Sequence, residues 1–258
     1  MSQDRLIYLP LGGAGEVGMN CYVYGYGPRD KERLIIVDLG VTFPDMDGSP
    51  GVDLIIPDIS WLEARKERID AVFITHGHED HIGAVPKLLK TLNIPVYGSY
   101  FTLAILKDSI EDHGLNISDY KFNVVSSKKT LNFDHVSVDF YNVTHSIPES
   151  LGIALTTKDG VIVYAPDYNF DQNVHKSYKT DFEKLSKIAG KPVLALLTES
   201  LGAENTGYTH SVGKLDYSLN QAFFQSESRI IVTAFSTDLV RIQKIIDIAL
   251  KYERKIAI

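Results

Sequence analysis

The chain has 258 residues, of which 44% are hydrophobic and 23% charged, proportions typical of a globular protein with a buried core. Its formal net charge of −7 argues against a protein that holds nucleic acid by bulk positive charge, so a polyanionic substrate would need a local positive site such as bound divalent metal ions. The N-terminal segment does not have the pattern of a secretion signal, and no uncharged apolar run approaches the about 20 residues that a membrane span needs, so we expect a protein that is neither secreted nor inserted in a membrane. Its one cysteine, Cys21, cannot form an intramolecular disulfide, which fits a cytoplasmic protein.

The first half of the chain alternates short β-rich runs with amphipathic helical segments, which predicts a mixed α/β fold. The expected strands are RLIYLPL, NCYVYGY, RLIIVDLG, AVFITH and PVYGS. Helices are expected over residues 58–69, 83–92 and 100–113, and the last has Ser99 as its N-cap and Gly114 as its stop signal.

Residues 13–18 fit the GxGxxG pattern of a dinucleotide-binding loop that follows a strand. The next segment, MNCYVYGYG, is β-rich and has no helical period, so no helix N-terminus would be available to hold a pyrophosphate. We therefore interpret this glycine-rich segment as the turn of a β-hairpin.

The second half begins with a β-meander and then changes character. The strands expected in the meander, which would pack against the earlier sheet, are FNVVS, SVDFYNVTH, GIALTT and GVIVYAPD. After Leu197 the pattern is a parallel βαβ rhythm, with helices over 212–225 and 239–252, a strand RIIVTAF and the start of another strand, KIAI. Because the last residue, Ile258, falls inside that apolar run, we interpret the chain as a fragment with a domain over 1–200 and the truncated beginning of a second domain over 201–258.

The run AVFITHGHEDHIGA places four metal-binding side chains within six residues, directly after an apolar strand. Imidazole and carboxylate are ligands that divalent metals such as zinc prefer, and a turn after a strand can direct such side chains toward two neighbouring ions. We expect His76 and His78 to bind one metal and Asp80 and His81 the other, with Gly77 forming a tight turn. The alternative is a solvated polar turn, which the clustering of histidines argues against.

Two later residues, His145 and Asp167, each end an expected strand at a polar break and are interpreted as the completing ligands, with Asp167 able to bridge both ions. Alone, each would more often be a packed or solvated side chain, and the histidine cluster reverses that expectation. Asp38, which also follows a strand, is expected to orient the histidine loop as a hydrogen-bond acceptor, and its alternative is a simple turn aspartate.

The helix that starts near Ser236 and Thr237 could offer backbone N–H groups to a phosphate or could have an ordinary N-cap, and the second alternative is more common. The remaining histidines are expected at the surface: His113, His135, His175 and His210.

Together, Asp38, residues 76–81, His145 and Asp167 resemble the ordered motifs of the metallo-β-lactamase superfamily. Within that superfamily, four segments resemble the ribonuclease J family of bacterial β-CASP nucleases, namely LGGAGEVGMN, VDLIIPDISWL, THGHEDHIGAVP and THSIPES. The motif TES puts Glu199 where that group has its first acidic β-CASP motif, and AFSTDLVRIQ is similar to its early β-CASP segment.

The resemblance implies an αββα four-layer sandwich with metals at the sheet edge, followed by the start of a β-CASP parallel α/β domain, with RNA in the cleft between them. It implies a zinc-dependent 5′–3′ exonuclease and endonuclease of RNA maturation and decay, with two Zn²⁺ ions, or Mn²⁺ or Mg²⁺ in their place. Asp80 would accept the proton of the attacking water, and the resemblance implies that Glu199 assists at the scissile phosphate. It also implies a homo-oligomer of the full-length protein and, beyond Ile258, a further histidine ligand for the second metal.

Two alternative functions stay open. A hydrolase of the same fold that cuts a thioester, lactone or β-lactam has the same metal motif, but it does not need the βαβ segment after Leu197. A non-catalytic partner subunit that has lost its metals would be expected to have an eroded HGHEDH motif, whereas every residue of that motif is present.

Overall fold

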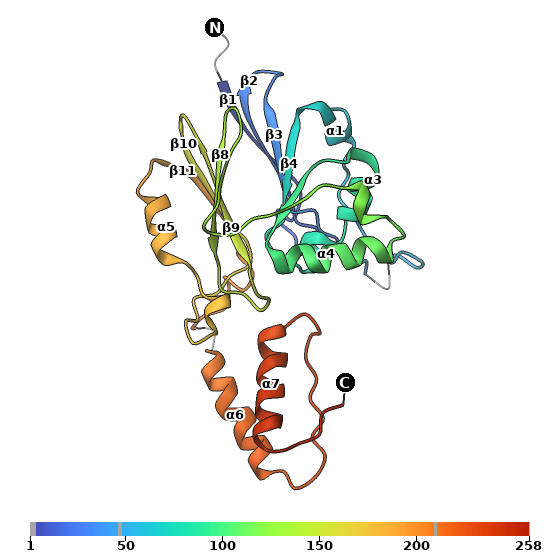
Figure 1. Cartoon of the computed structure of the whole chain (residues 1–258), viewed down its shortest axis with the longest axis vertical. Coiled ribbons are helices and arrows are strands. Elements are labelled where there is room, and N and C mark those ends of the chain that lie inside the picture. Colours follow the sequence, from blue (N-terminus) through green and yellow to red (C-terminus); the bar gives the residue numbers. More distant parts are fainter. Residues whose placement is uncertain (1–3, 46–47, 209–210, 258) are drawn as a thin grey trace.

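The computed structural model describes residues 4–45, 48–208 and 211–257 and consists of a two-sheet sandwich with a helical pair at one end (Figure 1). The first sheet has the strand order β1-β2-β3-β4-β5-β6, in which β1, β2 and β3 are antiparallel and the later pairs are parallel. Its strands are β1 (Asp4–Gly12), β2 (Cys21–Pro28), β3 (Arg33–Val37), β4 (Ile69–Phe73), β5 (Val96–Gly98) and β6 (Phe122–Val124).

The second sheet has the order β11-β10-β9-β8-β7 and is antiparallel except for the parallel pair of β10 and β11. Its strands are β7 (Thr130–Asn132), β8 (Ser137–Asn142), β9 (Leu151–Thr157), β10 (Gly160–Ala165) and β11 (Val193–Thr198). The sequence predicts β8, β9 and β10 but not β7, because three residues carry too short a pattern to be recognised.

Helices cover the outer face of each sheet, which gives the expected αββα layers (Figure 1). The helices are α1 (Ser60–Glu63), α2 (Glu79–Ile82), α3 (Val85–Leu92), α4 (Tyr100–Asp112), α5 (Phe182–Ala189), α6 (Val212–Gln225) and α7 (Leu239–Lys251), with 3₁₀ turns η1 (Lys66–Arg68), η2 (Ile117–Asp119) and η3 (Lys176–Tyr178). Among the described residues, no helix is long and apolar enough to cross a lipid bilayer.

Three apolar layers hold the described part of the sandwich together. One lies between the sheets and includes Phe73, Phe140 and Tyr164. Another joins the first sheet to α3 and α4 through residues such as Ile36 and Leu106, and a smaller one joins the second sheet to α5. Burying each such side chain contributes about 1.5–3 kcal/mol relative to leaving it in water.

The expected helices of the first half are only partly confirmed. Helix α4 begins at Tyr100 with Ser99 as its N-cap, whose Oγ accepts the N–H of Thr102, as expected. The helix expected over 58–69 is wrong in its length: only α1 and η1 form there, and the helical segment ends at Arg68 because Ile69 pairs with Leu34 as the first residue of β4.

The segment after β11 forms helices α6 and α7 close to the expected bounds but not the expected strands. Residues 229–235 (RIIVTAF) form no strand, and Ile231 and Phe235 are 85% and 81% exposed. A strand needs a neighbour to accept and donate its hydrogen bonds, and no strand of the described residues lies beside this segment. The expected strand at the C-terminal end is likewise not formed over 255–257.

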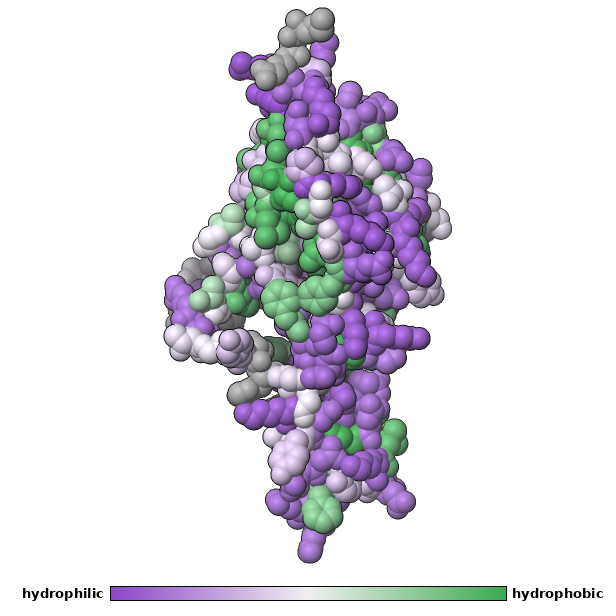
Figure 2. Space-filling view, turned by 90° about the vertical axis from the view of Figure 1, so that its left-hand side faces the viewer, coloured by the Kyte–Doolittle hydropathy of each residue, from purple (hydrophilic) through white to green (hydrophobic). Residues whose placement is uncertain are grey.

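The outer strand β11 exposes Val193, Leu194 and Leu196. In the space-filling view from the side where β11 and α5 lie, apolar green surface gathers over the sandwich and polar purple surface dominates the lower helical pair (Figure 2). The sheet edge that β11 forms is therefore more apolar than the surface of the helical pair.

Candidate metal centre

The histidine motif occupies the connection from β4 to α2. Residues 76–78 continue from the strand, and His78 has the extended backbone of an N-cap residue, so that Asp80 and His81 lie on the short helix α2. The change from strand to helix directs neighbouring side chains into two groups. Gly77 does not have a left-handed backbone. A Cβ atom there would lie 2.9 Å from Cδ1 of Ile105, so a larger residue would force that side chain to shift.

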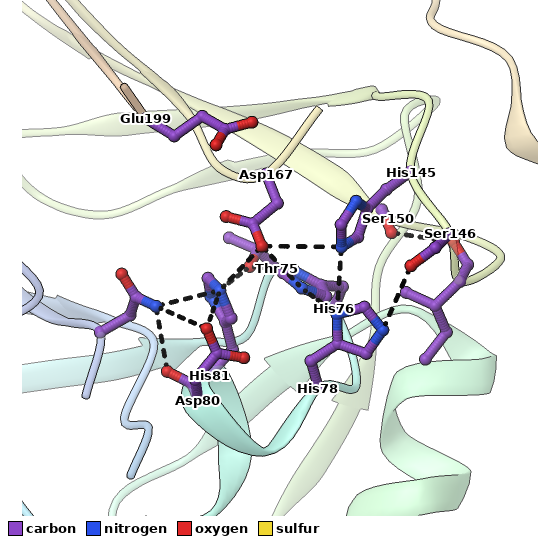
Figure 3. A network of polar contacts seen from close by, with 12 residues as sticks. Thr75, His76, His78, Asp80, His81, His145, Ser146, Ser150, Asp167 and Glu199 are labelled. Carbon is purple, nitrogen blue, oxygen red and sulfur yellow. Dashed lines mark hydrogen bonds and ion pairs between the residues drawn. The ribbon is translucent and has the colours of Figure 1, made fainter. Parts of the chain in front are cut away.

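Three imidazole nitrogens converge in the first group (Figure 3). Nδ1 of His78 lies 3.1 Å from Nε2 of His76 and 3.0 Å from Nε2 of His145, and Oδ2 of Asp167 lies 3.6 Å from Nε2 of His145. A neutral imidazole has one N–H and one lone pair, so three rings cannot satisfy one another at a single point. A shared divalent cation fits this set of three nitrogens and one carboxylate oxygen.

The second group consists of Asp80, His81 and again Asp167. Nε2 of His81 lies 3.5 Å from Oδ2 of Asp80 and 3.7 Å from Oδ2 of Asp167. Asp167 therefore belongs to both groups, as expected for a carboxylate between two ions. The structure thus gathers all six residues that the sequence singles out as ligands.

Asp38 supports the second group from behind, as predicted. It has no solvent exposure, accepts the backbone N–H of Thr75 at 2.8 Å, and places Oδ2 2.8 Å from Nδ1 of His81. An Nδ1–H donated to Asp38 leaves the Nε2 lone pair of His81 directed at Asp80 and Asp167.

Burial and neighbouring charges set the protonation of the site. Burial, followed by the neighbouring histidines, holds the pKa of His76 well below its usual value, and burial lowers the pKa of His145 to about 4. Burial alone would raise the pKa of Asp167, but hydrogen bonding and charge from His81 lower it to about 2. Neutral imidazoles and an ionised carboxylate are the forms that bind metal, so His76, His145 and Asp167 are prepared for a cation at neutral pH. Burial alone would lower the pKa of His81, but the charge of Asp38 and hydrogen bonds with Asp167 and Asp38 raise it well above its usual value, so this ring has to release a proton when a cation binds.

A cavity of about 540 Å³ opens on the side of the second group. Asp80, Asp167 and Glu199 line it together with residues 13 and 15–18 of the glycine-rich loop. Glu199 follows β11, and its Oε1 accepts the N–H of Tyr168 at 2.9 Å. Burial raises the pKa of Glu199. The cavity gives a substrate access to the carboxylates.

The glycine-rich residues 13–18 connect β1 to β2 as a hairpin loop, which confirms the interpretation from sequence. The loop ends beside the site: Nδ2 of Asn20 donates to the backbone oxygen of Asp80 at 3.1 Å and lies 3.1 Å from Nε2 of His81. Sequence reasoning missed Asn20, because nothing local connects it to a motif 60 residues away.

The segment that leads into α7 also reaches the site, a contact that the sequence did not predict. Nε2 of His78 lies 3.3 Å from the backbone oxygen of Thr237. The side chain of Asp238 caps the helix by accepting the N–H of Arg241 at 3.1 Å, so the ordinary N-cap alternative is the one observed, at the residue after Thr237.

The histidines expected at the surface are exposed where they are described, at His113, His135 and His175. His210 lies outside the described residues.

Comparison with known proteins gives consistent matches. The model of the Metallo-beta-lactamase superfamily matches residues 14–216. Ribonuclease J 2 of Staphylococcus aureus strain MRSA252 is 35% identical over 249 residues, and that of Staphylococcus saprophyticus is 36% identical over the same length. Each match covers 96% of this chain and 44% of the relative, so the chain spans less than half the length of these curated relatives.

Among solved structures, a protein of unknown function from Enterococcus faecalis V583 superposes with a TM-score of 0.63 at 18% identity. The superposition covers 95% of this chain and 63% of that one. At this identity the likeness shows a common fold.

Proposed function

The chain belongs to the metallo-beta-lactamase superfamily, and we propose that it is the metal-binding part of a ribonuclease that hydrolyses RNA phosphodiester bonds as a 5′–3′ exonuclease and endonuclease. The observation that carries the proposal is the pair of ligand groups that share Asp167 beside an open cavity. The similarity to ribonuclease J 2 proteins supports RNA as the substrate.

In this proposal, His76, His78, His145 and Asp167 hold one metal ion, and Asp80, His81 and Asp167 hold the other. Zinc is the proposed metal, because imidazole nitrogen and carboxylate oxygen suit it, and Mn²⁺ or Mg²⁺ would be the alternative. Bound divalent cations would supply Lewis-acid stabilisation of the phosphoryl oxygens and lower the pKa of a water molecule.

The chain's own groups would position the substrate and move the proton. Asp80 lies on the cavity wall and is the proposed acceptor of the proton of the attacking water. Glu199 lies on the same wall, and burial, which raises its pKa, favours a role as a proton donor or hydrogen-bond partner near the scissile phosphate. The role of Glu199 rests on its place beside Asp167 and on the resemblance described above.

We assign residues 1–200 to a metallo-β-lactamase domain and 201–258 to the beginning of a β-CASP domain. The last strand of the sandwich, β11, ends at Thr198, and α6 and α7 pack on each other around Phe223 and Ile248. In the full-length protein we propose RNA as the partner, a homo-oligomer as the assembly and the cytoplasm as the compartment.

A substrate panel tests the proposed activity. The chain with added zinc or manganese is incubated with a 5′-monophosphorylated RNA, a β-lactam and a thioester, beside a His76→Ala variant. We expect the parent chain to cleave the RNA and neither of the other two substrates, and we expect His76→Ala to cleave none of the three. Hydrolysis of the lactam or thioester instead of RNA would identify another hydrolase of the same fold, and cleavage of RNA that His76→Ala leaves unchanged would refute the assigned site.

A further inference from the structure

The loop that carries His145 contains a backbone conformation that L-amino acids rarely adopt. Glu149 has φ of +58°, in the left-handed region, and Glu is not among the residues that favour it. Such a conformation persists only where the surrounding structure holds it in place, and it often marks a functional constraint. The contacts of Glu149 show what holds it.

The carboxylate of Glu149 is attached to the start of α4. Its Oε2 accepts the backbone N–H of Phe101 at 2.9 Å. The first N–H groups of a helix have no partner within the helix and favour a negative charge. Ser99 accepts the N–H of Thr102, so the helix has its own cap and Glu149 adds a second anchor from 48 residues away.

The same loop and α4 both lie against the histidine motif, at Gly77. Ile147 is 2% exposed, and a Cβ atom on Gly77 would lie 2.9 Å from Ile105 of α4 and 3.4 Å from Ile147. The N–H of Leu151 also donates to the backbone oxygen of Thr75 at 2.9 Å. Helix α4 therefore contacts both loops that supply nitrogen ligands to the first group.

We propose that Glu149 is a positioning residue that fixes the His145 loop on α4 and so sets His145 against His76 and His78. The carboxylate of Glu149 sets the position of the His145 loop relative to α4. Because α4 also contacts Gly77, it sets the position of this loop relative to the histidine motif. Nε2 of His145 then lies 3.0 Å from Nδ1 of His78, close enough to share one cation. This inference rests on the proposed metal site and assigns to Glu149 no contact with substrate.

The test measures zinc affinity of the full chain by competition with a chelator, and thermal stability without metal. The variants are Glu149→Ala, Glu149→Gln and Glu149→Gly. The control is Glu111→Ala, which removes an exposed carboxylate from α4, the helix that Glu149 contacts. Loss of the hydrogen bond to Phe101 in Glu149→Ala is expected to weaken zinc binding at the first group about 10–100-fold. Glu149→Gln retains an oxygen acceptor and is expected to stay within a few-fold of the parent chain, like the control.

Glu149→Gly separates the anchor from the backbone strain. Glycine adopts positive φ freely, so this variant should melt at or above the temperature of Glu149→Ala without metal, yet bind zinc equally weakly. Parent-like zinc affinity in Glu149→Ala or Glu149→Gly, in a parent chain that does bind zinc, would overturn the positioning role alone. A parent chain that binds no metal would overturn the proposed site and the positioning role together.

Discussion

The carboxylate of Asp38 takes part in three hydrogen bonds next to the candidate metal ligands. It accepts the backbone N–H and the hydroxyl of Thr75 and faces Nδ1 of His81 at 2.8 Å, all without solvent. The position of Asp38 directly after β3 made it recognisable in the sequence. Its partners were not recognisable, because the 43 residues between Asp38 and His81 close up only in the folded sandwich.

Asp38→Asn should therefore damage both stability and metal binding. An amide N–H2 facing Nδ1–H of His81 puts two donors together, which costs about 1–3 kcal/mol and favours the wrong tautomer of His81. Metal affinity at the second group should fall about 10–100-fold. Urea unfolding and chelator competition measure the two effects, with exposed Asp134→Asn as the control. Equal stability and affinity of the two variants would contradict the role of Asp38.

Glu32 gives a pH-dependent prediction away from the metal site. It is 1% exposed and receives hydrogen bonds from Arg5 and Arg68. Burial alone would raise the pKa of Glu32, but the hydrogen bond from Arg5 and those from backbone N–H groups hold it below its usual value. A lowered folded-state pKa adds stability above the unfolded value, about 4.3, and that stability is lost as pH falls through the folded pKa.

The free energy of unfolding of the parent chain should thus exceed that of Glu32→Gln at pH 7, and the gap should narrow as the pH falls from about 5 toward 3. Urea titrations at several pH values measure the gap. A gap that stays constant or widens on acidification would show that the charge of Glu32 does not contribute in this way.

At the scale of elements, the segment that follows β3 lies in close contact with α2 at Gly40. A Cβ atom on Gly40 would lie 1.5 Å from the backbone oxygen of Asp80 and 2.7 Å from the backbone nitrogen of His81. Both neighbours are backbone atoms, so they cannot rotate away. Glycine at this position is what allows α2 to bring Asp80 and His81 into the second group.

Gly40→Ala should displace α2 or unfold the edge of the sandwich. The free energy of unfolding should fall by about 1–3 kcal/mol or more, as is typical of overpacking in a core. The matched control is Gly48→Ala, since no atom of the described residues lies within 4 Å of a Cβ atom there and the backbone is not left-handed. Thermal melting of the two variants is the measurement, and an unchanged melting temperature of Gly40→Ala would contradict the close contact.

Elements with a strong local pattern were predictable from the sequence. Helix α4 has both an N-cap residue and a glycine stop, and α6 has the bounds expected from its apolar spacing. The helix expected over 58–69 was wrong in its length, and its end is set by the pairing of Ile69 with Leu34, which overrode the local helical preference of that residue. The strand expected over 229–235 failed because its apolar residues lack a partner strand among the described residues.

At the scale of the whole molecule, the sandwich collects strand ends at one edge, and the candidate site is made from them. Asp38, His145 and Asp167 follow β3, β8 and β10, and the histidine motif follows β4. The motif and its spacing indicated four of the candidate ligands from sequence. His145 and Asp167 were inferred as completing ligands because each ends an expected strand at a polar break, and their convergence on the motif is visible only in the fold. The contact of Thr237 with His78 brings the segment before α7 to the same edge, above the helical pair (Figure 1).

The central claim, two neighbouring metal sites that share Asp167, is tested most directly by metal content. Mass spectrometry is carried out on the purified chain after zinc loading and on a variant with Asp80→Ala and His81→Ala, which keeps the first group intact. We predict two equivalents of zinc in the parent chain and one in the variant. A parent chain without bound metal, or a variant that keeps both equivalents, would contradict the assignment.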